Sequence, residues 1–223
     1  MDLVIIGAGG HGRVVLDILS AAGGHSVVGF LDADPSLRGA SVGGVPVLGP
    51  VNLLAKLWQQ KVRHGIVAIG DNRTRRRYGD QLRQQGFALI NAIHPSAVVS
   101  SSAKLGKNVV VAAQAAVCAE ACIDDFAIIN TGAIVDHECR VGAGAHITPG
   151  VRLAGRVQVG EEAFVGLGAN VIQCLSIGRG AIVGAGAVVI RDVPDGATAV
   201  GVPARVIRSA GSAQLANEER VNV

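Results

Sequence analysis

One histidine stands between carboxylates in the second half of this 223-residue chain, in the segment Asp136-His137-Glu138. An imidazole with the ordinary histidine pKa near 6.5 can take a proton from a nucleophile at neutral pH. A neighbouring carboxylate can hold the ring in one tautomer and stabilise the imidazolium that forms. Glu138 is the candidate partner and Asp136 the reserve. Adjacent side chains of a strand point to opposite faces, so Glu138 reaches the ring only if the chain bends there.

The element that carries this segment is a six-residue repeat. From Ile93 to Val189 every sixth residue is Ile, Leu or Val, without an insertion, and the residue four places after each is Ala, Val, Cys or Leu. An α-helix would spread such positions around its surface, whereas short strands joined by tight bends keep them on one side. Three hexads then close a triangular coil, and coils stack about 4.8 Å apart. The repeat predicts a β-helical prism of unspecified hand, with an inert β-solenoid as the alternative.

The repeat also places the histidine. His137 is the third residue of its hexad and should not point into the narrow core, and the stacked positions one coil away are Ala119 and Gly155. Such neighbours leave open space on the prism face, where a thioester could lie, and the Gly155 N–H is a candidate donor to an oxyanion. The residues alone leave a catalytic base and an interface residue equally open. Cys139 falls on an inward position and should be buried, so we do not expect its thiol to act as a nucleophile.

Residues 1 to about 90 follow a different, βαβ pattern, which predicts a parallel sheet with its binding edge at the carboxyl ends of the strands. The helix after residues 70–73 should run through Tyr78 to Gln85. The other expected elements are strands over Leu3–Ile6, Ser26–Leu31 and Ile66–Ile69 and a helix over Arg13–Ala22.

A glycine motif follows the first of these strands. Gly7-x-Gly9-x-x-Gly12 matches the dinucleotide fingerprint, and Asp32 stands about 20 residues on, where an acid that binds ribose belongs. Glycine lets the backbone approach a pyrophosphate, and the helix N-terminus offers free N–H groups. About 90 residues make only half of a full Rossmann domain, so the motif indicates a nucleotide phosphate more than a nicotinamide cofactor. An NAD-dependent oxidoreductase and a purely structural glycine turn remain alternatives.

Composition and charge narrow the classes of function. The net charge of +3 is small for this length, so nothing favours a nucleic-acid partner. No apolar run approaches the roughly 20 residues that span a bilayer, and the N-terminus lacks a signal-peptide pattern, which predicts no membrane insertion and a cytoplasmic location. Four cysteines without a CxxC pair fit a reducing compartment. A basic cluster is expected to form a solvated helix face, with an anion or subunit contact as the alternative: Arg73, Arg75, Arg76 and Arg77.

The remaining histidines argue against a metal. His94, His137 and His146 stand at the second, third and sixth positions of their hexads, so they do not stack as the three ligands of a zinc hydratase would. We therefore expect no metal. His25 and His64 lie in expected loops and should be surface residues.

Seven segments occur in an order that resembles one family of enzymes. They are Gly7-Ala-Gly-Gly-His-Gly12, Phe30-Leu-Asp32, Ala68-Ile-Gly-Asp-Asn72, Ile93-His-Pro-Ser-Ala97, Ile129-Asn-Thr-Gly132, Asp136-His-Glu138 and Gly201-Val-Pro-Ala204. The chain is similar to the sialic-acid O-acetyltransferase-like sugar acetyltransferases, and within them to the N-acetyltransferases of nucleotide-linked 4-amino-4,6-dideoxy sugars of the perosamine and bacillosamine type. A sugar O-acetyltransferase is the main alternative.

The resemblance implies a homotrimer that uses acetyl-CoA, and a left-handed β-helix. It implies a Rossmann-like nucleotide-sugar-binding domain over residues 1–91, a β-helical acetyltransferase domain over 92–208 and a polar tail over 209–223. His137 would be the general base, assisted by Glu138. The nucleotide-sugar would be held by Gly9, Gly10, His11, Asp32 and Gly70. Acetyl-CoA would lie between two prisms near His146, Gly155, Leu167 and Ala185. Ala33 departs from relatives that carry a second acid, which leaves recognition of the nucleobase or ribose open.

Overall fold

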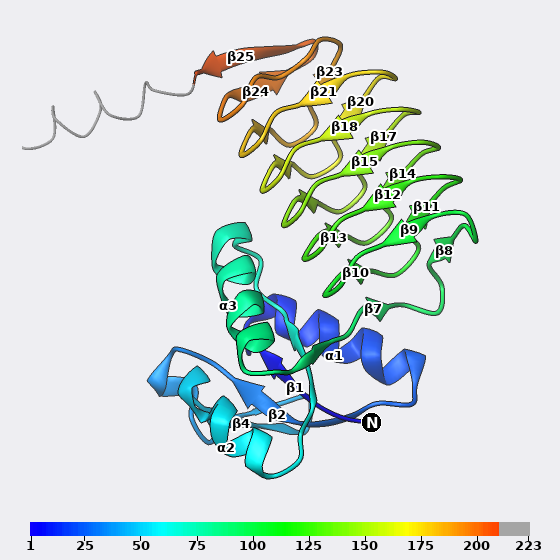
Figure 1. The fold of residues 1–223 in the computed structure, drawn as a ribbon. Coiled ribbons are helices and arrows are strands. Elements are labelled where there is room, and N and C mark those ends of the chain that lie inside the picture. The colour runs from blue at the N-terminus through cyan, green and yellow to red at the C-terminus, as the bar shows by residue number, and fades with distance from the viewer. Residues whose placement is uncertain (210–223) are drawn as a thin grey trace, which may run out of the picture.

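A computed structural model describes residues 1–209, which form an N-terminal α/β sheet domain and a tall three-sided prism of short strands (Figure 1). The sheet has the strand order β3-β4-β2-β1-β5-β6, and all neighbours are parallel except β3 and β4. Its strands are β1 (Asp2–Ile6), β2 (Ser26–Leu31), β3 (Ser41–Val42), β4 (Val45–Gly49), β5 (His64–Val67) and β6 (Ala88–Leu89). Its helices are α1 (Gly10–Ala22), α2 (Leu54–Gln59) and α3 (Asn72–Gln84), with short 3₁₀ turns at Pro35–Leu37 and Val51–Leu53.

The βαβ order is as predicted, but three boundaries differ. Helix α1 begins at Gly10 rather than Arg13, because Gly9 is the N-cap and its carbonyl already accepts the Arg13 N–H at 3.2 Å. Strand β5 spans His64–Val67 rather than Ile66–Ile69, because its pairing with β1 starts at His64. The prediction that His64 lies in a loop is therefore wrong. Helix α3 starts at Asn72, directly after its N-cap Asp71, whose carboxylate accepts the Thr74 N–H at 2.8 Å.

The hexad repeat forms a left-handed β-helix with three parallel faces. Face 1 consists of β7 (Ala92–Ile93), β10 (Val110–Val111), β13 (Ile128–Ile129), β16 (His146–Ile147), β19 (Phe164–Val165) and β22 (Ile182–Val183). Face 2 consists of β8 (Val98–Val99), β11 (Ala116–Val117), β14 (Ile134–Val135), β17 (Arg152–Leu153), β20 (Asn170–Val171) and β23 (Val188–Val189). Face 3 consists of β9 (Lys104–Leu105), β12 (Cys122–Ile123), β15 (Arg140–Val141), β18 (Gln158–Val159) and β21 (Ser176–Ile177).

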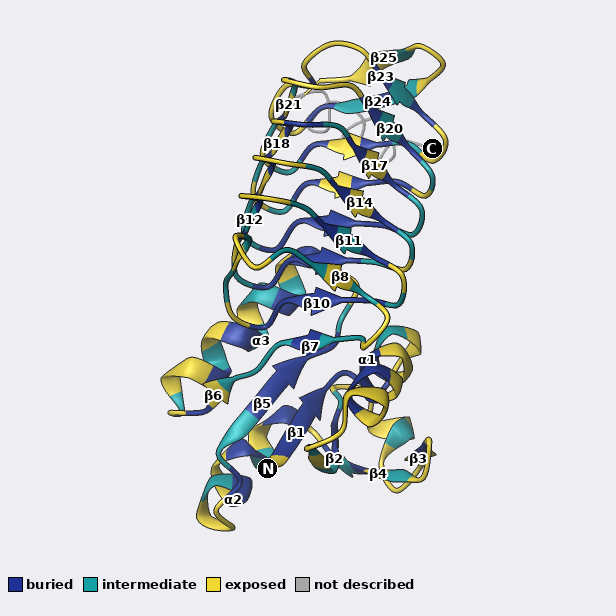
Figure 2. Ribbon diagram, turned by 90° about the vertical axis from the view of Figure 1, so that its right-hand side faces the viewer, coloured by how far each residue is buried: buried dark blue, intermediate teal, exposed yellow. Residues whose placement is uncertain are grey.

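Strict stacking explains how so narrow a core is stable. Strands pair with those exactly one coil away, as Val111 does with Ile129, so each inward aliphatic residue lies on an equivalent one. The inward residues are buried along the prism, while those of the first coil are only partly covered (Figure 2). At the other end, β24 (Thr198–Gly201) joins face 1 and pairs with the antiparallel β25 (Ala204–Arg208). The predicted tail from residue 209 lies, apart from Ser209, outside the described residues.

Face 1 is the face that meets the N-terminal domain. One apolar cluster unites α1 and the sheet with Val110 and Ile128 of this face, so α1 lies between the two bodies (Figure 1). The fully buried Asn108 strengthens the junction, since its amide accepts from the Val67 N–H at 2.7 Å and donates to the Val67 carbonyl at 3.1 Å. None of the helices in residues 1–209 has the length and apolar character needed to cross a bilayer.

Candidate active site

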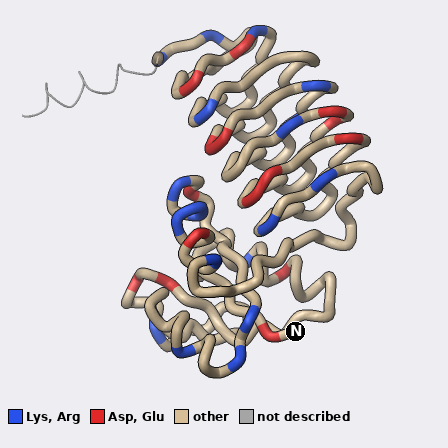
Figure 3. Tube along the Cα trace, in the orientation of Figure 1, with Lys and Arg blue, Asp and Glu red and all other residues tan. Residues whose placement is uncertain are grey.

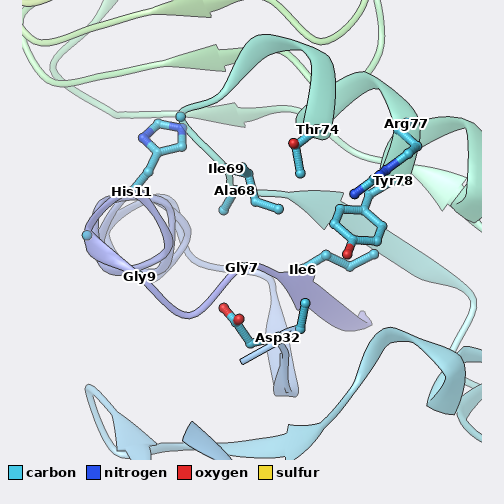
Figure 4. Close-up of a pocket in the computed structure, with 13 residues that line it drawn as sticks. Ile6, Gly7, Gly9, His11, Asp32, Ala68, Ile69, Thr74, Arg77 and Tyr78 are labelled. Carbon is cyan, nitrogen blue, oxygen red and sulfur yellow. The ribbon is translucent and has the colours of Figure 1, made fainter. Parts of the chain in front are cut away.

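A cavity of about 400 Å³ opens where β1, β2 and β5 end and α1 begins (Figure 4). Gly9, Gly10, His11, Asp32 and Gly70, the residues expected to hold the nucleotide-sugar, all line it. Parallel strands bring their carboxyl ends to one edge of a sheet, which is why residues so far apart in sequence meet here.

The loop at the base of the cavity is tightly built. Gly12 must be a glycine, because a Cβ there would lie 2.1 Å from the Gly7 carbonyl oxygen. The two Asp32 carboxylate oxygens accept the N–H groups of Ala8 at 2.7 Å and Asp34 at 2.9 Å. Asp32 therefore fixes the shape of the glycine loop, in addition to any contact it makes with a ligand. The start of α1, next to this loop, offers the N–H groups and the dipole end that favour a phosphate.

Helix α3 supplies a wall of the cavity through Thr74, Arg77 and Tyr78. The sequence did not predict that these three residues line the cavity. The Arg77 guanidinium carbon lies 5.0 Å from the centre of the Tyr78 ring. The arginine-rich composition of the helix was the available signal, but the helix pattern did not indicate which face meets the cavity.

The prediction of a solvated basic face on α3 is confirmed for Arg73 and Arg77 but wrong for Arg75 and Arg76, because this part of the helix packs against the prism. Arg75 is fully buried. Arg76 bonds to Glu161 at 2.9 Å and to Glu162 at 3.0 Å. Arg73 and Arg77 are exposed, and the Arg73 side chain, 87% exposed, lies 3.6 Å from a Glu162 carboxylate oxygen.

His137 lies on the edge between faces 2 and 3, and its ring is bonded to the adjacent carboxylate. Its Nδ1 is 2.9 Å from a Glu138 carboxylate oxygen, and both side chains are about half exposed, 49% and 48%. The required bend is present, since Glu138 has φ +58° and its side chain turns back toward the ring. Asp136 instead accepts the His137 backbone N–H at 2.7 Å. A carboxylate on Nδ1 favours the tautomer with the proton there, which leaves the Nε2 lone pair free to accept a proton.

The imidazole lies directly against Gly155, one coil further on. A Cβ at Gly155 would be 2.4 Å from His137 Nε2, so any other residue would displace the ring. Within the described residues the Gly155 N–H has no hydrogen-bond partner. Cys139 is buried, and burial raises the pKa of its thiol to about 11. Its Sγ donates to the Ala154 carbonyl at 3.2 Å.

A second pair of histidines lies at the domain junction, where His146 is buried and His11 is partly buried. The ring centres of His11 and His146 are 6.3 Å apart, and Asn130 Nδ2 lies 3.1 Å from His146 Nε2. Burial first, and the charge of Arg75 second, lower the pKa of His11 to about 4 and that of His146 to about 3. Both rings are therefore neutral at physiological pH.

One chain does not bring together the four residues expected near acetyl-CoA. Gly155 lies on the edge between faces 2 and 3, whereas Leu167 and Ala185 lie in adjacent coils on the edge between faces 1 and 2. The remaining residue of the four, His146, is on face 1. In a three-sided prism the edge of His137 is opposite face 1, so His137 and the cavity lie on opposite sides of one chain.

No group of three or more His, Cys, Asp or Glu side chains in residues 1–209 is arranged to hold a metal. All four cysteines are free.

Known proteins share this arrangement of domains. Residues 2–82 match the family described as the PglD N-terminal domain. The GDP-perosamine N-acetyltransferase of Escherichia coli O157:H7 is 31% identical over 158 residues, 69% of this chain and 70% of that protein. The crystal structure of PerB from Caulobacter crescentus, in complex with CoA and GDP-perosamine, is 52% identical with a TM-score of 0.89, covering 92% of this chain and 97% of that one. The acetyltransferase domain of PglB from Neisseria gonorrhoeae, in complex with acetyl coenzyme A, is 41% identical with a TM-score of 0.86, covering 92% and 98%.

The β-helix with its half-Rossmann domain defines an acyltransferase of the hexapeptide-repeat class. More narrowly, the chain belongs to the sugar N-acetyltransferase family that includes the perosamine and bacillosamine enzymes.

Proposed function

We propose that this enzyme transfers the acetyl group of acetyl-CoA to the 4-amino group of a nucleotide-linked 4-amino-4,6-dideoxy sugar, and that it acts as a cytoplasmic homotrimer. The observation that carries the proposal is the His137–Glu138 pair, bonded at 2.9 Å beside the side-chain-free Gly155. A half-exposed imidazole with an anchored Nδ1 and a free Nε2 suits a base that meets its substrate at a surface. Four free cysteines agree with a reducing compartment.

The N-terminal cavity supports a nucleotide-linked acceptor. Its glycine loop and the first turn of α1 present backbone N–H groups, which suit a pyrophosphate. Asp32, at the end of β2, stands where a ribose hydroxyl would be bound. The proteins with 52% identity and with 31% identity are both named for GDP-perosamine, which makes a GDP-sugar the first acceptor to test.

The separation of cavity and base supports the trimer. Since His137 lies opposite the face that carries the N-terminal domain, a sugar in the cavity must reach the base of another copy. A neighbouring prism would also bring Leu167 and Ala185 of one copy toward Gly155 of the next, which gives acetyl-CoA a groove between two chains. Closed cyclic assemblies repeat such a heterologous contact at every interface.

The chemistry is direct attack. The amine nitrogen attacks the thioester carbonyl carbon while His137 Nε2 takes the amine proton, and Glu138 stabilises the imidazolium that results. The carbonyl oxygen becomes an oxyanion, for which the Gly155 N–H is the donor we propose. The carbon–sulfur bond then breaks, and CoA leaves as a thiol with a proton returned from His137. Substitution of a histidine has been studied in the Caulobacter relative, whose His-to-Ala variant was crystallised with CoA and GDP-perosamine.

An assay of thiol release tests the proposal. Acetyl-CoA is supplied with GDP-, UDP- or dTDP-linked 4-amino sugars, and with the matching 4-hydroxy sugars as controls. We expect turnover with one amino sugar and none with its hydroxy counterpart. Turnover with hydroxyl acceptors only would overturn the proposal in favour of an O-acetyltransferase.

A further inference from the structure

Arg75 is a fully buried cation whose hydrogen bonds all end on uncharged oxygens. Its guanidinium has five N–H groups, and five bonds use all of them. The acceptors are the carbonyls of Phe126 at 2.7 Å, Ile69 at 2.9 Å, Gly70 at 3.0 Å and Gly144 at 2.8 Å, and the side-chain oxygen of Asn72 at 2.8 Å.

These acceptors belong to two different parts of the molecule. Ile69 and Gly70 form a wall of the nucleotide cavity. Phe126 and Gly144 are equivalent positions in successive coils, on the edge between faces 1 and 3. The next equivalent residue is Glu162, whose carbonyl accepts from Asn72 Nδ2 at 2.9 Å. The first turn of α3 thus binds three stacked carbonyls of the prism and, through Arg75, the cavity wall.

We propose that Arg75 is a positioning residue for the nucleotide-sugar: it fixes the Ile69–Gly70 wall of the cavity to the prism, so that a sugar held by the N-terminal domain stays in register with the acetyl-transfer site. This inference rests on the proposed function.

The energetics favour this role over simple packing. A buried cation without a carboxylate partner is costly, and burial lowers the pKa of Arg75 to about 10. An apolar side chain could fill the space without that cost, but it could not join acceptors from two domains. The planar guanidinium does so with a rigid set of donors, which a lysine cannot reproduce with its three.

Other contacts of α3 dock the helix without touching the cavity and supply a matched control. Basic side chains recur along the helix (Figure 3). Arg83, near its far end, forms an ion pair with Asp125 and lies over the Phe126 ring, 4.7 Å from its centre. Arg83 is 39% exposed and does not line the cavity. Arg83→Met therefore removes a cation from the same helix and the same interface but leaves the cavity wall held.

The test compares wild type, Arg75→Met, Arg75→Lys and Arg83→Met as full-length proteins. Titration calorimetry with GDP and with UDP gives the nucleotide Kd, and steady-state assays give KM for the nucleotide-sugar and kcat. We expect Arg75→Met to raise the nucleotide Kd and the sugar KM by about tenfold or more, because the wall is released. Arg75→Lys should fall between it and wild type, and Arg83→Met should stay within about twofold of wild type.

The outcomes separate the explanations. If Arg75 had a merely structural role, Arg75→Met would reduce the fraction of folded enzyme, which lowers kcat but leaves the nucleotide Kd and the sugar KM unchanged. That result would overturn this inference without affecting the proposed function. An equal rise of Kd in Arg83→Met also overturns it. If Arg75→Met does not fold, Arg75→Lys decides by the same criteria. Failure of wild type to bind either nucleotide would overturn the proposed nucleotide site and this inference with it.

Discussion

Two histidine sites in this protein place the same side chain in opposite surroundings. His137 is half exposed at an edge of the prism, with a carboxylate on its Nδ1. At the domain junction, near the guanidinium of Arg75, His146 is buried and His11 is partly buried. The carboxylate prepares the first ring to accept a proton, whereas burial and a nearby cation keep the other two neutral. The comparison separates the ring that we propose as the base from rings that can offer only uncharged contacts.

Loss of the exposed ring should have the largest effect. His137→Ala should lower kcat by about a thousandfold, because the amine loses its base. Thiol release measured at saturating substrates reports this loss, and light scattering checks that the assembly is intact. His94→Ala is the matched control, since the His94 ring bonds to Ser96 on another edge, and it should keep wild-type kcat. A His137→Ala enzyme as active as that control would contradict the assignment.

A substitution at Gly155, which stacks against His137, tests whether kcat depends on the position of the imidazole ring. Gly155→Ala should lower kcat by about tenfold or more, because the new Cβ would lie 2.4 Å from the resting position of Nε2. The effect must act through the imidazole, so the substitution should cost nothing further when added to His137→Ala. An additive loss in the double variant would show that Gly155 acts independently of the ring.

Acidification tests the buried pair. Unfolding releases His11 and His146 from pKa values of about 4 and about 3 to the ordinary histidine pKa of 6.5, so below pH 6.5 the unfolded chain binds more protons. Stability is therefore complete above about pH 6.5 and falls as the pH drops, by about 1.4 kcal/mol per histidine per pH unit. Denaturant melts between about pH 7 and 5 measure the slope, which should be smaller in His11→Asn. A flat profile would contradict the burial of these rings in neutral form.

The sequence predicted most of the prism and the His137 edge, because every contact there is local or repeats at a fixed spacing. The hexad period determines which residues point inward, and it places His137 one coil before Gly155. Each coil of a β-helix contacts only the neighbouring coils, so the hexad pattern alone determines which residues stack on one another.

The domain junction could not be predicted in the same way. Helix periodicity shows that Arg75 and Arg76 lie on α3, but not which face of the helix meets another domain. The prediction of an exposed side chain failed for Arg75 because four of its five acceptors are backbone carbonyls, which carry no sequence signal. A fingerprint fixes the spacing of Gly9 and Asp32, and the family resemblance added Gly10, His11 and Gly70, whereas Thr74 and Tyr78 belong to no such motif.

The buried thiol beside the catalytic edge should matter least. Cys139→Ala should keep kcat within about twofold, because a thiol whose pKa is raised to about 11 is protonated at neutral pH and is no nucleophile. The lost packing and the bond to Ala154 should cost about 1 kcal/mol of folding stability. Thiol release and mass spectrometry of the enzyme during turnover check both points. An acetyl group found on Cys139 would contradict direct transfer.

We propose that a sugar bound in the cavity of one chain reaches His137 of another chain. Mixing two inactive variants tests it most directly: His137→Ala, which keeps the cavity, and Gly9→Trp, which fills the cavity but keeps the base. Gly9 has an extended backbone and open space around its Cβ, so the larger side chain fits without strain. After the two variants are refolded together in equal amounts, each mixed trimer has one site in which an intact cavity faces an intact base. Random assembly therefore gives about a quarter of wild-type activity. A mixture no more active than its separate components would contradict the account.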